Sequence, residues 1–199
     1  VLTGQTVPVF QVDIAAKYTG RITAVNAVLG QVVSKGQNLI VQDMGDVDIS
    51  IAQNGASLRQ ANADAIESQA NFEANYQKAQ ADYERAITSF ARYKTLYEQG
   101  AVSKEVLDNT QQQVTAAQAS LETWSKQMAM GSAATVLSKQ AARDKAQSAV
   151  EALENQKNDL ILRAPRDGVI GYRQAEVGAM AQAGVKLLSI VDNSHIFID

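Results

Sequence analysis

Apolar side chains recur every seven residues through the middle of the chain, a spacing typical of a helix that packs along one face. The first stripe consists of Ile51, Leu58, Ala65, Phe72, Ala79, Ala86 and Tyr93, and a second, aromatic stripe of Tyr76, Tyr83, Phe90 and Tyr97. Good helix formers surround both stripes, and no proline occurs from 46 to 159. The pattern therefore predicts a long helix with a coiled-coil seam. The aromatic rings either pack inside that seam or face a partner helix.

A second set of apolar positions predicts a helix that returns along the first. Its members are Leu107, Val114, Leu121 and Met128, flanked by Thr110, Ala117, Trp124 and Gly131. After Gly131 and Ser132 the apolar phase shifts, to Val136, Leu137, Ala146, Val150 and Leu153. A phase shift at a glycine predicts an irregularity or bend in the returning helix.

The two helical stretches meet near Gly100, which suits the position just after a helix C-terminus. Ser103 suits the N-cap of the next helix, with the acidic Glu105 and Asp108 in the turn beyond it. The stretch 46–159 is thus predicted to be an antiparallel helical hairpin with its tip near 99–103. Each arm would hold roughly 50 residues and extend on the order of 70 Å.

The two ends of the chain carry a repeat. Six residues recur in the same order at a constant offset of about 148 positions. They are Gly20, Ile22, Ala27, Gly30, Gly36 and Leu39, which recur as Gly168, Ile170, Ala175, Gly178, Gly184 and Leu187. A duplicated, glycine-punctuated unit on both sides of the helical stretch indicates one interrupted domain.

Both ends contain strand-like runs, such as 7–12, 39–41 and 160–162. Glycines at 20, 30, 36 and 45 are expected to supply the positive φ of tight turns, and the stretch 165–168 (Pro-Arg-Asp-Gly) reads as another turn. Each half has too few strands to bury a core, so we expect the halves to pair face to face. The fold class is therefore α+β. Residues 7–45 plus 160–192 form one β-sandwich that a helical hairpin interrupts, with the two ends of the insert adjacent. Residues 1–6 and 193–199 are expected to be edges of a further, truncated β domain.

Composition and charge exclude several classes of function. The net charge of −3 and the absence of a basic stripe argue against a nucleic-acid partner. The chain has no cysteine and a single histidine, His195, which we interpret as a strand or turn residue. No nucleophile elbow, phosphate-binding glycine loop or zinc-ligand spacing occurs, so we expect no enzyme, no metal and no cofactor. No apolar run is long enough to span a membrane, so membrane attachment would need segments outside this chain.

A β-sandwich in two halves around a long helical hairpin resembles the periplasmic adaptor, or membrane fusion protein, family (AcrA-, MacA- and HlyD-like proteins). The halves look like those of a biotinyl/lipoyl-like domain, a barrel-sandwich hybrid. The stretch 161–170, Ile-Leu-Arg-Ala-Pro-Arg-Asp-Gly-Val-Ile, resembles the family signature at the start of the second half. Gly178 and Gly184 fit the later part of the same family pattern.

The predicted hairpin tip carries a second match. Adaptors that dock TolC-type channels share Arg-Leu, two residues, Leu, six residues, Ser. Here Arg92, Leu96 and Ser103 match, while Tyr93 replaces the usual Leu as a large seam residue. The resemblance implies that the tip meets the helical end of such a channel through Arg92, Tyr93, Leu96, Gly100, Val102 and Ser103. Without the resemblance, Arg92 would be interpreted as a solvated helix residue and Ser103 only as an N-cap.

The resemblance implies a periplasmic adaptor attached to the inner membrane. It would link an inner-membrane transporter to a TolC-type outer-membrane channel, as a homo-oligomer in a ring of about six copies. The transported substrate and the class of pump stay open. Two alternatives remain. A biotinyl or lipoyl carrier would need a modified lysine in the turn that joins the halves, where this chain has its insert. A structural coiled-coil protein would leave the split repeat without a role.

Overall fold

The computed structural model describes residues 6–8, 10–129, 134–191 and 196–198. His195, Gly131 and Ser132, which the sequence singled out, lie outside the described residues. The chain forms two compact units, one from 1–54 and 149–199 and the other from 55–148. The boundaries between these units, at 54/55 and 148/149, lie inside helices. The domain boundaries expected from the sequence, at 45/46 and 159/160, therefore stay a prediction.

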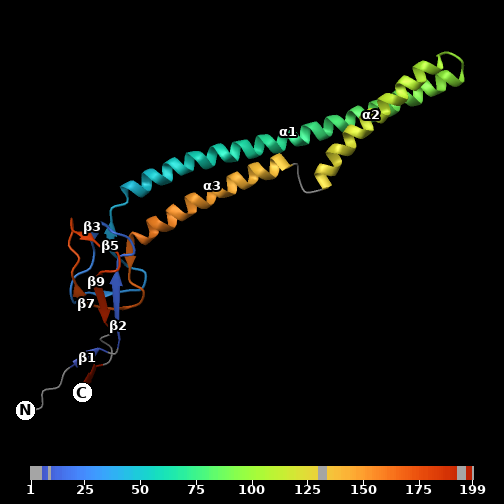
Figure 1. Cartoon of the computed structure of the whole chain (residues 1–199). Helices are drawn as coiled ribbons and strands as arrows, with labels where there is room; N and C mark the ends of the chain where they lie inside the picture. Colours follow the sequence, from blue (N-terminus) through green and yellow to red (C-terminus); the bar gives the residue numbers. More distant parts are fainter. Residues whose placement is uncertain (1–5, 9, 130–133, 192–195, 199) are drawn as a thin grey trace, which may run out of the picture. The chain divides into compact units, whose positions relative to one another are not determined.

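Over the described residues, the first unit is built from ten strands in three antiparallel sheets (Figure 1). The strands are β1 (Thr6–Pro8), β2 (Gln11–Ala15), β3 (Gly20–Val25), β4 (Val32–Val33), β5 (Asn38–Gln42), β6 (Ile161–Arg163), β7 (Gly168–Arg173), β8 (Met180–Ala181), β9 (Lys186–Val191) and β10 (Ile196–Ile198). Two four-stranded sheets have the orders β2-β9-β7-β4 and β6-β5-β3-β8, and β1 pairs with β10 in a two-stranded sheet. The run 7–12 is therefore not one strand: it is divided between β1 and β2.

The two halves of the repeat interleave, and the expectation that they pair face to face is wrong. Each four-stranded sheet takes two strands from the first half and two from the second. The offset of the repeat relates β3 to β7, β4 to β8 and β5 to β9, and it places β6 on the end of β2. When each strand is replaced by its equivalent in the other half, the order β2-β9-β7-β4 becomes β6-β5-β3-β8. Neither half can complete a sheet alone, because every sheet needs strands from both.

Hydrogen bonds in the turns repeat this exchange. The Gly30 N–H donates to the Ile170 carbonyl, and the Gly178 N–H donates to the Ile22 carbonyl, both at 2.8 Å. The pattern extends to side chains. In the signature stretch, Asp167 Oδ1 accepts the Lys35 N–H at 2.7 Å, and Thr19 Oγ1 accepts the Ala183 N–H at the equivalent place in the other half. The signature aspartate thus ties the second half to a turn of the first.

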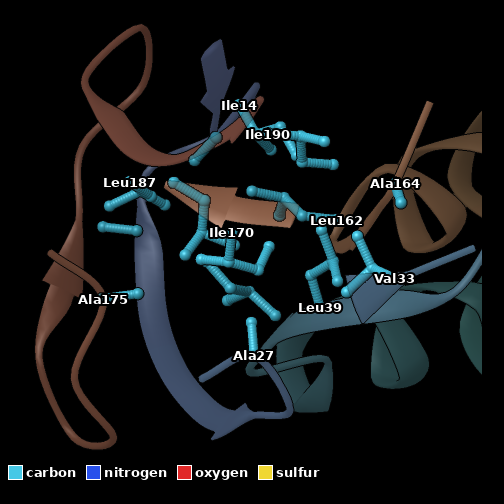
Figure 2. Close-up of a cluster of buried hydrophobic side chains, with 14 of the residues drawn as sticks. Ile14, Ala27, Val33, Leu39, Leu162, Ala164, Ile170, Ala175, Leu187 and Ile190 are labelled. Atoms are coloured by element: carbon cyan, nitrogen blue, oxygen red, sulfur yellow. The ribbon is translucent and has the colours of Figure 1, made fainter. Parts of the chain in front are cut away.

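A hydrophobic core lies between the sheets (Figure 2). Its side chains come in repeat-related pairs, because equivalent strand positions point inward in both halves. Ile22 and Ile170 are each 1% exposed, and Ala27 and Ala175 likewise. Gln42 breaks the symmetry: it is buried where the other half has Ile190, and its Nε2 donates to the Tyr18 carbonyl at 2.9 Å. The repeat seen in the sequence is therefore a repeat of buried positions.

The glycines of the two β-rich ends serve different purposes. Gly30, Gly36, Gly178 and Gly184 have positive φ, as the turns were expected to require. Gly20, Gly45 and Gly168 do not, so that expectation is wrong for these three. Gly168 opens strand β7 instead, and a Cβ there would overlap Ile190 and approach the Val191 carbonyl oxygen to 2.9 Å.

The two ends of the helical insert are adjacent, as predicted. Strand β5, which precedes the insert, pairs antiparallel with β6, which comes after it, and Val41 lies opposite Ile161. Beside this junction the Lys157 ammonium lies 2.6 Å from the Asp48 carboxylate. The insert therefore begins and ends on neighbouring strands of one sheet.

The described part of the insert consists of three helices, α1 (Gly45–Glu98), α2 (Lys104–Ala129) and α3 (Ala134–Asp159). Helix α1 covers the first predicted arm, and α2 and α3 cover the second. The heptad seam is confirmed, since Ala65, Phe72 and Ala79 are buried at intervals of seven. On the returning arm Thr110 and Val136 are buried. Tyr76, Tyr83 and Phe90 are half-buried.

Three residues assigned to the seam lie outside it. Tyr97 is 40% exposed, in the last turn of α1. Met128 and Leu137 are 45% and 48% exposed, on either side of the place where α2 ends and α3 begins. Leu137 comes directly after the buried Val136, and one helical step turns a side chain by about 100°. The seam of α3 therefore starts at Val136 in a phase of its own, and Leu137 points away from it.

Candidate docking site at the hairpin tip

The turn between α1 and α2 is held by backbone hydrogen bonds around Gly100. Gly100 has a φ of 72°, the left-handed conformation expected just after a helix. Its N–H donates to the Tyr97 carbonyl at 2.9 Å, and the Ala101 N–H donates to the Leu96 carbonyl at 2.8 Å. This pair of bonds is the Schellman motif, which satisfies carbonyls that the end of a helix leaves free. The tip is thus a defined turn rather than a loose loop.

Ser103 caps the start of α2. The Val106 N–H donates to Ser103 Oγ at 3.4 Å, and the Leu107 N–H donates to the Ser103 carbonyl at 3.3 Å. The N-cap prediction is confirmed. A side-chain bond of 3.4 Å is long, and the Ser103 side chain is exposed, so its hydroxyl remains accessible to a partner.

Arg92 lies two turns before the end of α1 and is exposed. Its guanidinium carbon lies 5.6 Å from the centre of the Tyr93 ring. No carboxylate within the described ranges forms an ion pair with Arg92. Its hydrogen-bond donors are therefore available to a partner on the outer face of the helix.

Leu96 and Val102 are half-buried, one before and one after the turn. The structure thus gathers Leu96, Gly100, Val102 and Ser103 at the turn, with Arg92 and Tyr93 farther back along α1. The six residue steps from Arg92 to Glu98, the last residue of α1, correspond to about 9 Å of helix.

Three observations concern other kinds of site. Over the residues that the structure describes, no group of three or more His, Cys, Asp or Glu side chains is placed to hold a metal ion. Among the helices described, none is long and apolar enough to cross a membrane. Only Asp43 and Met44 separate β5 from α1, so that junction offers no lysine in a tight turn, as a biotinyl or lipoyl carrier would need.

Comparison with known proteins places the hairpin in a family. Residues 68–138 match the α-helical hairpin domain of membrane fusion proteins of the resistance-nodulation-division (RND) type. This stretch contains more than half of α1, the tip, α2 and the start of α3. The resemblance drawn from the sequence is confirmed for the hairpin, which is similar to that of membrane fusion, or periplasmic adaptor, proteins.

The chain is also similar to individual proteins. The chain is 24% identical to the probable multidrug resistance protein EmrK of Escherichia coli K12, over 94% of this chain and 50% of EmrK. It is similar in fold to the periplasmic adaptor protein EmrA, with a TM-score of 0.55, 16% identity, and coverage of 97% of this chain and 75% of EmrA. MacA from Actinobacillus actinomycetemcomitans gives a TM-score of 0.54 at 21% identity, covering 98% of this chain and 53% of MacA. The chain thus spans about half the length of the curated relative that it matches.

Sequence reasoning missed one feature of the hairpin. Where α1 faces the adjoining ends of α2 and α3, a cavity forms around Phe72 and Trp124. Both residues were assigned only to the seam. The one available signal was a tryptophan, the largest side chain, at a position flanking a seam otherwise rich in alanine.

Proposed function

We propose that this chain is part of a periplasmic adaptor attached to the inner membrane, which links an inner-membrane transporter to a TolC-type outer-membrane channel for export. The hairpin tip docks the channel. The proposal is supported by the family match over 68–138 and by the similarity to EmrK and EmrA, described as a probable multidrug resistance protein and a periplasmic adaptor.

The observation that carries the docking proposal is the construction of the tip. A hydrogen-bonded turn holds two half-buried apolar side chains, Leu96 and Val102, close to the exposed hydroxyl of Ser103. An exposed arginine stands behind them, with no ion-pair partner in the described part of the chain. Because the turn is already formed, less conformational entropy is lost when it binds a partner.

Each tip residue has a role in such a contact. Arg92 offers five donors in a planar fork, which suits carboxylates and carbonyls at the end of a helical channel. Leu96 and Val102 supply apolar area beside the turn, and Ser103 supplies a hydroxyl. Tyr93 holds its ring near the Arg92 guanidinium and limits where that side chain points.

The decisive variant is Arg92→Glu in the full-length protein, assayed for drug efflux or secretion in cells that lack their own adaptor. We expect transport to be abolished while expression and thermal unfolding stay near wild type. Ser103→Trp is expected to abolish transport as well, by steric obstruction at the turn.

Arg59→Glu provides the matched control, because Arg59 is also exposed on α1 but lies far from the tip. It makes the same change of charge and should leave transport unchanged. Normal transport by the Arg92→Glu protein, or an equal loss in the control, would remove the tip assignment.

The oligomeric proposal is a ring of about six copies. A structural coiled-coil protein is one alternative, and it would self-associate through the hairpin alone. Binding of the purified full-length protein to an outer-membrane channel favours the adaptor. Mass spectrometry that finds a lipoyl or biotinyl adduct would favour a carrier instead.

A further inference from the structure

The second unit contains a cavity of about 670 Å³ between α1 and the facing ends of α2 and α3. Small-molecule sites in proteins commonly have volumes of this order, roughly 300–1,000 Å³. All three helices contribute side chains to its wall, and none of the six tip residues takes part. The cavity is therefore a candidate binding site separate from the proposed docking site.

The floor of the cavity is aromatic and apolar. Phe72 is 6% exposed, Val136 is 1% exposed and Trp124 is half-buried. The rings of Phe72 and Trp124 lie 5.6 Å apart with their planes at 64°, an edge-to-face arrangement. Trp124 is the ring of this pair with open surface, because Phe72 is almost fully buried, and aromatic faces carry the negative end of the ring quadrupole. A flat apolar group or an organic cation is the ligand that this floor suits.

The polar wall carries one paired and one unpaired carboxylate. Asp64 lies 3.1 Å from the Lys139 ammonium and accepts a hydrogen bond from Gln60 Nε2 at 2.7 Å. These two partners hold the pKa of Asp64 below its usual value, so it stays ionised and neutralises Lys139. Glu67 also lines the cavity, but it has no hydrogen-bond or ion-pair partner within the part of the chain that the structure describes. The wall therefore has one uncompensated negative charge.

We propose that this cavity binds a flat, apolar organic cation, with its ring against Trp124 and its positive charge beside Glu67. The biological role rests on the proposed export function: the adaptor would hold a cationic substrate during export. Binding itself depends on the cavity and does not require a channel or a transporter.

The chain has a single tryptophan, so its fluorescence reports this cavity alone. The purified full chain would be titrated with benzyltrimethylammonium while Trp124 is excited. We expect a saturable change in emission. Benzyl alcohol, which keeps the ring without the charge, should bind at least about ten-fold more weakly, because the cation–π and charge interactions are absent. Benzenesulfonate should give no saturable change.

Two substitutions of Glu67 test the charge directly. Glu67→Gln keeps the size of the side chain and should weaken benzyltrimethylammonium about five-fold, the effect of losing one exposed charge pair. Glu67→Lys should abolish cation binding. Glu98→Gln, the same change at another exposed glutamate of α1, is the control and should bind as the wild type does.

Circular dichroism would confirm that each variant keeps its helical content. The proposal is overturned if the wild type shows no saturable response, if all three probes bind equally, or if Glu67→Gln binds as tightly as Glu98→Gln. Each of these results leaves the tip assignment intact, because the titration contains no channel. Conversely, normal transport by Arg92→Glu would not alter the binding result.

Discussion

Gly168 has no space for a side chain at the start of β7, and replacing it with alanine tests the interleaved packing. A Cβ at this position would overlap Ile190 Cγ2 and lie 2.9 Å from the Val191 carbonyl oxygen. Val191 belongs to β9, the strand that pairs with β7, so its backbone cannot move without disturbing the ladder. The φ of Gly168 is not positive, so the prediction depends on space alone.

The repeat supplies the matched control, since Gly20 occupies the equivalent position in the other half. A Cβ there would meet the Gln42 amide nitrogen at 3.2 Å, a side-chain contact that a shift of a few tenths of an ångström relieves. Overpacking a core costs about 1–3 kcal/mol, and replacing a strand glycine recovers roughly 0.5–1 kcal/mol of backbone entropy. We therefore expect Gly168→Ala to destabilise the sandwich by about 2 kcal/mol, and Gly20→Ala to change it by less than about 1 kcal/mol.

Amide hydrogen exchange is the appropriate assay, because it reads the sandwich separately from the helices. The Ile22 N–H, which donates to the Ala179 carbonyl at 2.8 Å, is a suitable reporter within the core. A loss of about 2 kcal/mol lowers its protection about 30-fold. If Gly168→Ala leaves the protection equal to that of Gly20→Ala, the packing argument for β7 against β9 is refuted.

Two further predictions concern the helices. Gly55→Ala should raise the midpoint of thermal unfolding followed at 222 nm. Gly55 lies inside α1, where alanine is favoured over glycine by about 1 kcal/mol, and an added Cβ would meet only Arg59 Nη1, at 3.8 Å. A lower midpoint would contradict this prediction. Asp64→Asn should reduce the urea midpoint at neutral pH but not at about pH 2. The pKa of Asp64 is lowered in the folded state, so the ionised carboxylate stabilises the fold fully above the ordinary pKa of 3.8. This stabilisation is lost as the pH falls through the lowered pKa of the folded state. A difference in urea midpoint that does not change with pH would refute the prediction.

Features that depend on local sequence could be predicted closely. The turn at Gly100 and the cap at Ser103 arise from the preferences of single residues at helix ends, and both were found. The heptad seam arises from helical periodicity, and Phe72 is buried where that periodicity placed it. The repeat also identified Ile22 and Ile170 as equivalent positions, and both are buried in the structure.

Features that depend on pairing between distant segments could not be predicted. A repeat says which positions are equivalent but not which strand lies beside which, so the interleaving of the halves was missed. The same limit applies to Gly168, whose need for space arises from Val191 on another strand. The cavity beside Trp124 depends on where α2 ends and α3 begins, and the heptad pattern of one helix does not contain that information.

The place of the insert is explained by the geometry of the sheet. Strands β5 and β6 are antiparallel neighbours, so the end of β5 lies beside the start of β6. A short turn would ordinarily join two such strands. Antiparallel strands lie about 4.8 Å apart and packed helices about 8–10 Å apart. The two linking residues before α1 and Leu160 after α3 span the difference, and the Lys157–Asp48 ion pair joins the bases of the two arms. A helical hairpin can therefore take the place of a turn between these strands, provided that its arms match in length. Helix α1 has 54 residues, and α2 and α3 have 26 residues each, which meets that condition.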